Sequence, residues 1–262
     1  MPVRCRSLRL VIVVALALGI APLAVAADAP TTEEWTPVVT AIAEQAPTAG
    51  TQLTAITTRY PKWVGGWIEL ARFDLAAQQP EDAWKHARQA LTLQRNNGEA
   101  AALAVQALTK TGRHDHALTV AEPFRVNRQD DKQSGGRAGW VNFYAAQAAL
   151  TAAQPDLAKA DELLKIAKSC AGGAVPGEFH FLEAKLMIRR DDLAGGAKSL
   201  ERAVATEPRL WDAWYELGRV RSALGEREPS VPGQRQLLLA AEPVSYTHLR
   251  AHETKANLVC RL

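Results

Sequence analysis

The stretch Trp211-Asp212-Ala213-Trp214-Tyr215-Glu216-Leu217-Gly218 decides how this chain folds. In a helix, Trp214, Leu217 and Gly218 lie on one face, because residues three and four apart are neighbours on its surface. A glycine in that face lets a second helix approach closely, and the bulky residues beside it fill the space around the crossing. Pro208 separates this stretch from the helical pattern upstream. We therefore expect the stretch to be the first helix of a tightly packed pair.

The same arrangement recurs along the chain at a nearly constant spacing. A small residue expected in the second helix of each pair recurs with steps of 34, 34, 43 and 36, at Ala49, Ala83, Ala117, Ala160 and Gly196. A residue of the first helix recurs with steps of 34, 43, 36 and 34, at Ala71, Val105, Ala148, Ala184 and Gly218. A helix pair of this length cannot bury its apolar stripe alone, so successive copies must stack.

The W-x2-L-G spacing of Trp214, Leu217 and Gly218 resembles the tetratricopeptide repeat (TPR) family, and Trp67, Leu70 and Ala71 repeat it with alanine for glycine. The resemblance covers about residues 33–225. The sequence departs from the motif at Ala101, which replaces the usual Trp, and at the second-turn aromatic, replaced by Asp74, Leu108, Thr151, Met187 and Arg221. The resemblance implies an all-α helix–turn–helix solenoid, a right-handed superhelix of about five to six repeats, truncated at its C-terminus.

Residues 1–26 have the pattern of a secretory signal peptide. Three arginines precede an apolar run, Leu10–Val25, and Ala24-Val25-Ala26 has the form of a cleavage site. The apolar run approaches the length that spans a bilayer, so an uncleaved membrane anchor is the alternative. We expect cleavage and a periplasmic or secreted location.

Two further segments fall outside the repeat, which we expect to occupy residues 27–242. The 43-residue step places an insertion at residues 125–139, and this stretch has no apolar periodicity, which predicts a solvated loop. A loop that carries binding is the alternative, since long connections often do. Residues 243–262 match no register of the repeat, and Val244–Thr254 resembles translated sequencing-adapter read-through. We expect a disordered, artefactual tail, with the natural chain cut near Glu242 and its cap or a further domain missing.

The charge of the array gives no reason to expect nucleic-acid binding. The chain holds 31 basic and 28 acidic residues, of which three basic residues lie in residues 1–26 and three basic and one acidic residue in residues 243–262. The remainder has 25 basic and 27 acidic residues, which is nearly neutral. Cys170 is the only cysteine between residues 27 and 242, so a disulfide framework is not expected.

The sequence contains no convincing catalytic, cofactor or metal site. His114 and His116 are two residues apart on an expected helix, and therefore point to different sides of it. His248 and His252 have a better spacing for a metal, but they lie in the suspect tail. Neither a G-x-G-x-x-G loop nor a strand pattern that could carry a Ser-His-Asp triad is present. We therefore expect a protein that is not an enzyme and needs no cofactor.

The resemblance implies that the first helices line a concave groove that binds peptides. The outward register there reads Arg72, Gln106, Ala149, Lys185 and Arg219, and one turn earlier it reads Ile68, Ala102, Ala145, Phe181 and Tyr215. The candidate partner-binding residues are Arg72, Gln106, Phe181, Lys185, Tyr215 and Arg219. They predict a mildly basic, partly aromatic groove for an extended or acidic peptide, although solvated surface charges are the simpler reading. The Lys and Asn set of the family's carboxylate clamp is not reproduced, since Ile68 and Arg72 stand at its first positions.

These observations predict an exported, non-enzymatic scaffold that binds a protein or peptide of unknown identity. It would contact a membrane only if the signal peptide is uncleaved. Two alternatives are the recognition arm of an enzyme whose catalytic domain is missing, and an assembly chaperone for envelope proteins or cytochromes.

Overall fold

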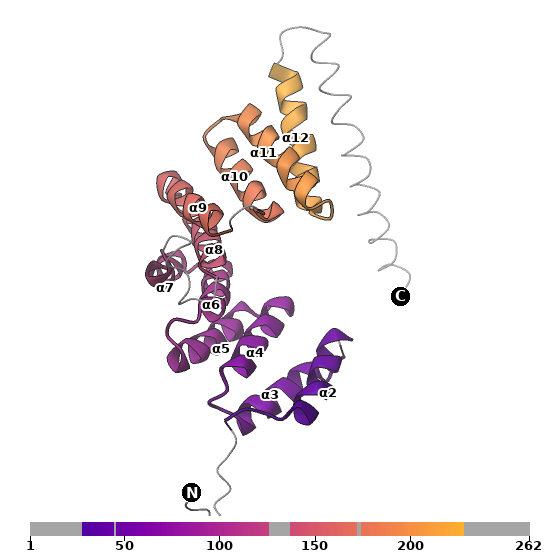
Figure 1. Cartoon of the computed structure of the whole chain (residues 1–262). Coiled ribbons are helices and arrows are strands. Elements are labelled where there is room, and N and C mark those ends of the chain that lie inside the picture. The colour runs from indigo at the N-terminus through magenta and orange to yellow at the C-terminus, as the bar shows by residue number, and fades with distance from the viewer. Residues whose placement is uncertain (1–27, 45, 126–136, 172–173, 228–262) are drawn as a thin grey trace, which may run out of the picture. The chain divides into compact units, whose positions relative to one another are not determined.

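The computed structural model describes residues 28–44, 46–125, 137–171 and 174–227, and all regular elements among them are helices (Figure 1). The predictions of a signal peptide and of an artefactual tail lie outside these residues, as do residues 126–136 of the predicted insertion. The chain divides into two compact units at the Trp63–Val64 bond. None of the described helices is long and apolar enough to cross a membrane.

The first unit contains one helix pair, α2 (Thr32–Ala43) and α3 (Ala49–Arg59). Helix α2 begins with a capping box, in which the Thr31 hydroxyl accepts from the Glu34 amide and the Glu34 carboxylate accepts from the Thr31 amide. The same carboxylate accepts a 2.6 Å hydrogen bond from the Tyr60 hydroxyl after α3. Trp35 and Trp63 pack edge to face with their ring centroids 4.9 Å apart. These contacts hold the two ends of the unit together.

The second unit continues with helix pairs joined by tight turns. Its helices are α4 (Val64–Ala76), α5 (Pro80–Leu93), α6 (Gly98–Lys110), α7 (His114–Ala121), the 3₁₀ turn η1 (Glu122–Phe124), α8 (Ala138–Thr151), α9 (Leu157–Ala171), α10 (Gly177–Arg189), α11 (Leu193–Thr206) and α12 (Trp211–Arg227). The pairs are α4 with α5, α6 with α7, α8 with α9, and α10 with α11, while α12 packs on α11. Each pair also packs on the next, as a stacked repeat requires.

Three of the four turns within these pairs have the same construction. They are three residues long, and the middle residue adopts a left-handed conformation, with φ of 59° at Gln78, 74° at Gly112 and 63° at Asp191. The turn between α8 and α9 differs, because it spans residues 152–156 and contains no residue with positive φ. The α8–α9 pair is therefore connected by two more residues than the others.

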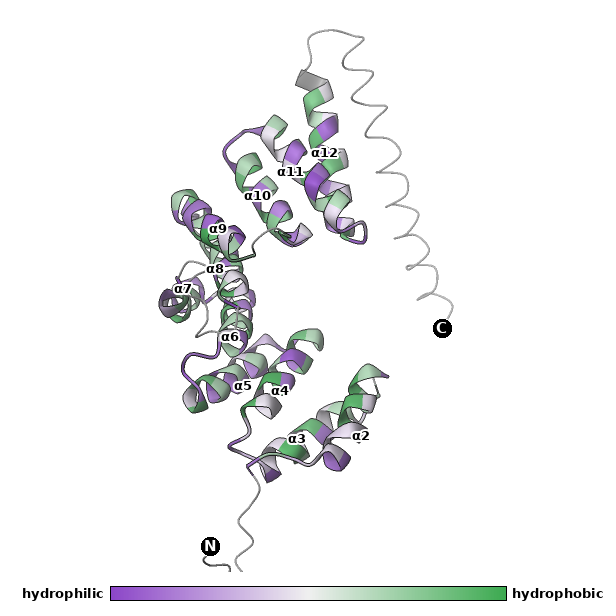
Figure 2. Cartoon of the chain, in the orientation of Figure 1, coloured by the Kyte–Doolittle hydropathy of each residue, from purple (hydrophilic) through white to green (hydrophobic). Residues whose placement is uncertain are grey.

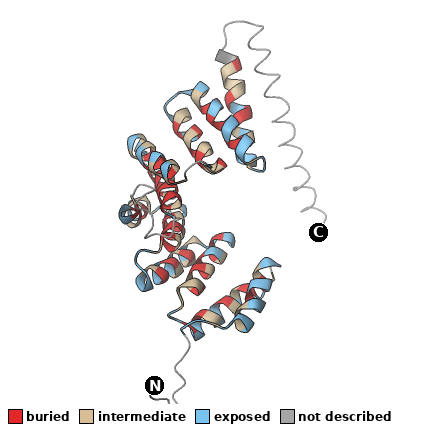
Figure 3. Cartoon of the chain, viewed as in Figure 1, coloured by how far each residue is buried: buried red, intermediate tan, exposed pale blue. Residues whose placement is uncertain are grey.

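The predicted registers coincide with the buried sides of the helices (Figure 3). All five small residues of the second-helix register are buried, as are Ala71, Val105, Ala184 and Gly218 of the first-helix register. The two registers meet where α10 and α11 cross. A Cβ added at Gly196 would lie 2.9 Å from Ile188 Cγ1 and 3.5 Å from the Ala184 carbonyl oxygen. The close approach inferred from the repeat is thus present.

The predicted register is wrong in one helix, α8. Helices α4, α6 and α10 each end five residues after their register residue, at Ala76, Lys110 and Arg189. Helix α8 ends at Thr151, so its register residue is Ala146 and not Ala148. The error arises because the α8–α9 turn is two residues longer than the other turns. The prediction assumed a turn of normal length and assigned all the extra residues of the 43-residue step to the insertion before α8. The predicted loop also ends too late, since Ala138 and Gly139 are already helical.

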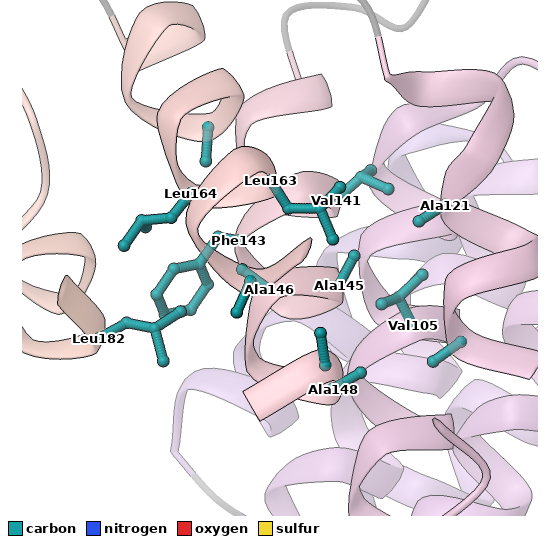
Figure 4. Close-up of a cluster of buried hydrophobic side chains, with 14 of the residues drawn as sticks. Val105, Ala121, Val141, Phe143, Ala145, Ala146, Ala148, Leu163, Leu164 and Leu182 are labelled. Atoms are coloured by element: carbon teal, nitrogen blue, oxygen red, sulfur yellow. The ribbon is translucent and has the colours of Figure 1, made fainter. Parts of the chain in front are cut away.

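The largest hydrophobic cluster of the described residues runs from α6 to α10 and is centred on α8 (Figure 4). A second cluster joins α10, α11 and α12 around Ala184, Leu200 and Leu217. Apolar and polar residues alternate around most of the helices, as expected for helices that are covered on one side only (Figure 2). Helix α8 differs, because most of its residues are buried.

Candidate interaction surface on the first helices

With the register of α8 corrected, two sets of equivalent positions can be compared along the first helices of the second unit. We call Ile68, Ala102, Phe143, Phe181 and Tyr215 the ring register. We call Arg72, Gln106, Gln147, Lys185 and Arg219 the polar register. Members of the two registers on one helix are four residues apart, so their side chains are neighbours. Ala145 and Ala149, which the sequence placed in these registers, are buried.

In α4, α6 and α8 the side chains of these registers are buried, paired or uncharged. Ile68, Ala102 and Phe143 are buried in the array. The Arg72 guanidinium pairs with Glu69 at 2.7 Å and also with Glu99, so its charge is compensated within the protein. Gln106 and Gln147 are half-buried and uncharged. Of the predicted partner residues, Arg72 is thus exposed but paired with two glutamates, and Gln106 is half-buried.

In α10 and α12 each aromatic residue of the ring register meets the cation that follows it. The Lys185 ammonium lies 4.1 Å from the ring centroid of Phe181, and the Arg219 guanidinium carbon lies 5.9 Å from the centroid of Tyr215. Both distances fall within the range of an attractive cation–π contact. Tyr215 is 44% exposed, and the Arg219 side chain is 62% exposed and also pairs with Glu216 at 3.0 Å. The structure therefore brings together four of the six predicted residues as two matching pairs.

The sequence reasoning did not single out Trp211 as a site residue. This side chain is 59% exposed and lies one turn before Tyr215 on α12. Its position four residues before an aromatic residue of the ring register was the available signal. Trp211 and Tyr215 together form an aromatic stripe on the first turns of α12.

A cluster of aromatic rings packs between α8 and α10 and includes Phe143 of the ring register. Phe143 and Phe179 stack with centroids 4.7 Å apart, and Trp140 meets the Phe179 ring edge-on at 5.1 Å. Tyr144 packs on Phe143 at 5.2 Å. Burial and, secondarily, the negative charge of Glu178 raise the pKa of Tyr144 to about 12. This phenol is therefore neutral at physiological pH and acts as a packing group rather than a base.

Two carboxyl groups of α10 have opposite environments. Burial, together with the charge and hydrogen bond of Glu207, raises the pKa of Glu178. Burial also acts to raise the pKa of Glu183, but hydrogen bonds and charges of Lys168 and His180 outweigh it, so the pKa of Glu183 is lowered. Lys168 Nζ lies 2.7 Å from Glu183, and His180 Nδ1 and Ser199 Oγ each lie 3.4 Å from it. Glu183 is thus a polar hub that joins α9, α10 and α11.

The described residues contain no group of three or more His, Cys, Asp or Glu side chains placed to hold a metal ion. The His86 imidazole contacts the buried Asp74 carboxylate at 2.6 Å and packs beside Trp67, with centroids 5.7 Å apart. Asp74 occupies a position where the repeat usually has an aromatic residue, and the His86 ring is its contact partner. This pair is accounted for by packing within the α4–α5 pair.

No protein-family model and no curated protein matches the chain. Among solved structures it is similar to TTC0263, a thermophilic TPR protein of Thermus thermophilus, with a TM-score of 0.57 and 15% identity over 71% of this chain and 98% of that one. It is less similar to MamA of Desulfovibrio magneticus RS-1 (TM-score 0.48, 14% identity, 73% and 96% covered) and to YrrB, a TPR protein with an unusual peptide-binding site (0.46, 16%, 77% and 97%). The likeness to TTC0263 confirms the predicted fold, an all-α array of TPR-type helix pairs.

Proposed function

We propose that this TPR-type array is a non-enzymatic interaction module that binds a segment of a protein partner on the outer side of its first helices. The observation that carries the proposal is the pair of registers. Five successive first helices repeat the same two positions, and in α10 and α12 these positions hold an aromatic ring, half-buried at Phe181 and exposed at Tyr215, beside a cation. Tyr and Arg, which stand at these positions of α12, are among the residue types most enriched at the energetic centres of protein interfaces.

A surface of this kind favours binding because it is preformed. The backbones of α4, α6, α8 and α10 are fixed by packing on their own second helices and on a neighbouring pair, and α12 packs on α11. A partner that docks there therefore does not have to order the array, which keeps the entropic cost of association low. The near-neutral array, with 25 basic and 27 acidic residues in 27–242, favours a protein or peptide over nucleic acid.

We also propose that the module works outside the cytoplasm, in the periplasm or as a secreted protein, which rests on the signal-peptide pattern of residues 1–26. Fractionation of a bacterium that expresses the full chain, followed by N-terminal sequencing, tests this proposal. Recovery from the exported fraction with Ala27 as first residue supports it. Recovery of the uncleaved chain in the cytoplasm contradicts it.

The binding proposal is tested by capture of partners from the exported fraction. The test variant is Lys185→Glu/Arg219→Glu. The matched control is Lys198→Glu/Arg202→Glu, which makes the same charge change at two exposed residues of α11, a second helix. We expect the wild type and the control to capture the same specific partner and the test variant to lose it, with all three equally helical by circular dichroism. The same partners on all three proteins would exclude this surface as the binding site.

A further inference from the structure

We propose that the ligand is an extended peptide segment in which an acidic side chain lies next to an aromatic or aliphatic one, and that the ring–cation pairs of α10 and α12 read it. This inference rests on the proposed function and adds to it the chemical class of the ligand and the part of the array that binds it. The two reading units are Phe181 with Lys185 and Tyr215 with Arg219.

The two units belong to one continuous part of the structure. Phe181 of α10 packs against the hydrophobic cluster that contains Ala184, and Ala213 and Leu217 of α12 belong to the same cluster. In Figure 1 helices α10, α11 and α12 follow one another as neighbours. Both α10 and α12 pack on α11, so the two units stand on successive first helices of one packed group.

The cations explain the preference for an acidic group. Among the described residues no carboxylate forms a salt bridge with Lys185, whose Nζ lies over the ring of Phe181. The pair of Arg219 with Glu216 uses Nη1 of a guanidinium that has five N–H donors. A ring beneath a cation restricts its movement and removes water from one side, which favours a charge-assisted bond with a carboxylate on the other side.

The exposed rings explain the preference for an adjacent apolar group. The large hydrophobic side chains exposed among the described residues are Val39, Leu93, Trp211 and Tyr215. Two of these four stand one turn apart on α12, directly before Arg219. Aromatic side chains bury a large area at a low cost in conformational entropy, and a ring or branched aliphatic group of the ligand would cover them.

Acidic side chains on the same helices restrict where the ligand's acid can lie. Glu178 and Asp212 each stand three residues before the ring of their helix, toward its N-terminus. Their charges would repel an acid placed there. The acidic group is therefore expected over Lys185 and Arg219, and the apolar group over the rings and Trp211.

Selection from a random nonamer peptide library displayed on phage tests the ligand class. The bait is the full chain as wild type, as Lys185→Met/Arg219→Met, or as the control Lys198→Met/Arg202→Met. Methionine keeps an unbranched apolar side chain and removes the charge. We expect the wild type and the control to enrich one consensus, an acidic residue beside an aromatic or aliphatic one, which the test variant does not enrich.

The most enriched peptide and its analogue with each Asp or Glu changed to Asn or Gln are then compared by fluorescence anisotropy. Because the analogue cannot form a charge-assisted hydrogen bond, we expect it to bind at least about tenfold more weakly. A consensus without acids, no consensus at all, or equal affinity of the two peptides overturns this inference. Self-association of the chain that Tyr215→Ser abolishes would also overturn it, since the occupant would then be a second copy.

The two proposals fail in different ways. If the peptide result is negative but capture from the exported fraction still depends on Lys185 and Arg219, the first-helix surface binds a partner of another chemistry. If capture is also independent of these residues, both proposals are wrong.

Discussion

The joint between α6 and α8 and the joint between α8 and α10 are built from different side chains. At the first joint Ala145 and Ala148 of α8 lie beside Val105 of α6, and small residues let the two helices meet along much of their length (Figure 4). At the second joint Phe143 and Phe179 stack, and α8 and α10 meet along a much shorter stretch. The small residues thus allow a long contact between α6 and α8, whereas bulky rings fill the shorter contact between α8 and α10.

The exposure of the ring register changes at the ring joint. Before the ring joint, the ring register is buried and Arg72 is compensated by two glutamates. After it, Phe181, Tyr215 and Trp211 become partly or largely exposed, and each ring of the register has a cation beside it. The array thus contains a part in which the ring register is buried, α4 to α8, and a part in which it is at least partly exposed, α10 to α12.

The largest effect on this comparison is expected from Phe179→Ala. Phe179 is 1% exposed and contacts both Phe143 and Trp140, so its removal leaves a cavity at the ring joint. We expect a loss of about 3–5 kcal/mol in the free energy of unfolding, measured by urea denaturation followed by circular dichroism. Phe181→Ala, at a half-buried ring of the same helix, is the control and should lose distinctly less. Equal losses would mean that the rings of α8 and α10 do not form a joint.

The alanine joint is expected to break by overpacking. Ala145→Leu adds three carbon atoms at a position with no exposed surface. It should lower the free energy of unfolding by about 1–3 kcal/mol. The exposed Ala158→Leu of α9 is the control, and a shift of the urea midpoint is expected for the first variant only. Tolerance of leucine at 145 would show that α6 and α8 are not closely packed there.

The polar hub of α10 is expected to contribute less than either joint. Glu183→Gln removes the charge that pairs with Lys168 and faces His180. Because the carboxylate is largely buried, we expect a loss of about 1–2 kcal/mol, reduced by the remaining amide hydrogen bonds. Glu201→Gln, which breaks the more exposed pair with Arg221, should cost less than about 1 kcal/mol. A larger loss for Glu201→Gln would contradict the role of Glu183 as a hub.

The smallest effect is a pH dependence from Glu178. Since its pKa is raised in the folded protein, the folded state holds a proton that the unfolded state releases. Its contribution to stability is therefore complete below the ordinary glutamate pKa and is lost as pH rises through the raised value. Glu178→Gln should flatten that decline in urea midpoints measured between pH 4 and 8, whereas Asp115→Asn at an exposed site should not. Parallel curves for wild type and Glu178→Gln would contradict the assignment.

Glu183 gives the opposite trend. Its pKa is lowered, so its contribution is present above the ordinary glutamate pKa and is lost as pH falls through the lowered value. Glu178→Gln should therefore change the pH dependence of stability only above the ordinary glutamate pKa, and Glu183→Gln only below it.

The repeat was predictable because the registers that define it are buried contacts with a fixed spacing. Ala49, Ala83 and Ala117 could be aligned by counting, since the connections between the first and second of these residues have the same lengths as those between the second and third. Counting failed at α8, because the 43-residue step combines an insertion before the helix with a longer turn after it. Spacing alone cannot divide extra residues between two connections, and this error placed buried Ala149 on the surface.

The candidate site was predictable only where the chemistry is local. The contact of Phe181 with Lys185, and that of Tyr215 with Arg219, follows from helical spacing within one element. The compensation of Arg72 by Glu99 depends on contact between two repeats, and the hub at Glu183 joins three helices. Such contacts cannot be read from the spacing within a single helix.

Photo-crosslinking from single positions tests most directly whether binding is confined to α10 and α12. Tyr215 and Leu93 are both exposed hydrophobic residues, on α12 and on α5 respectively, and each can be replaced by benzoylphenylalanine in the full chain. After irradiation with the exported fraction, we predict a specific crosslinked partner from position 215 and none from position 93. The same partner crosslinked equally from both positions, or from position 93 alone, would contradict the account.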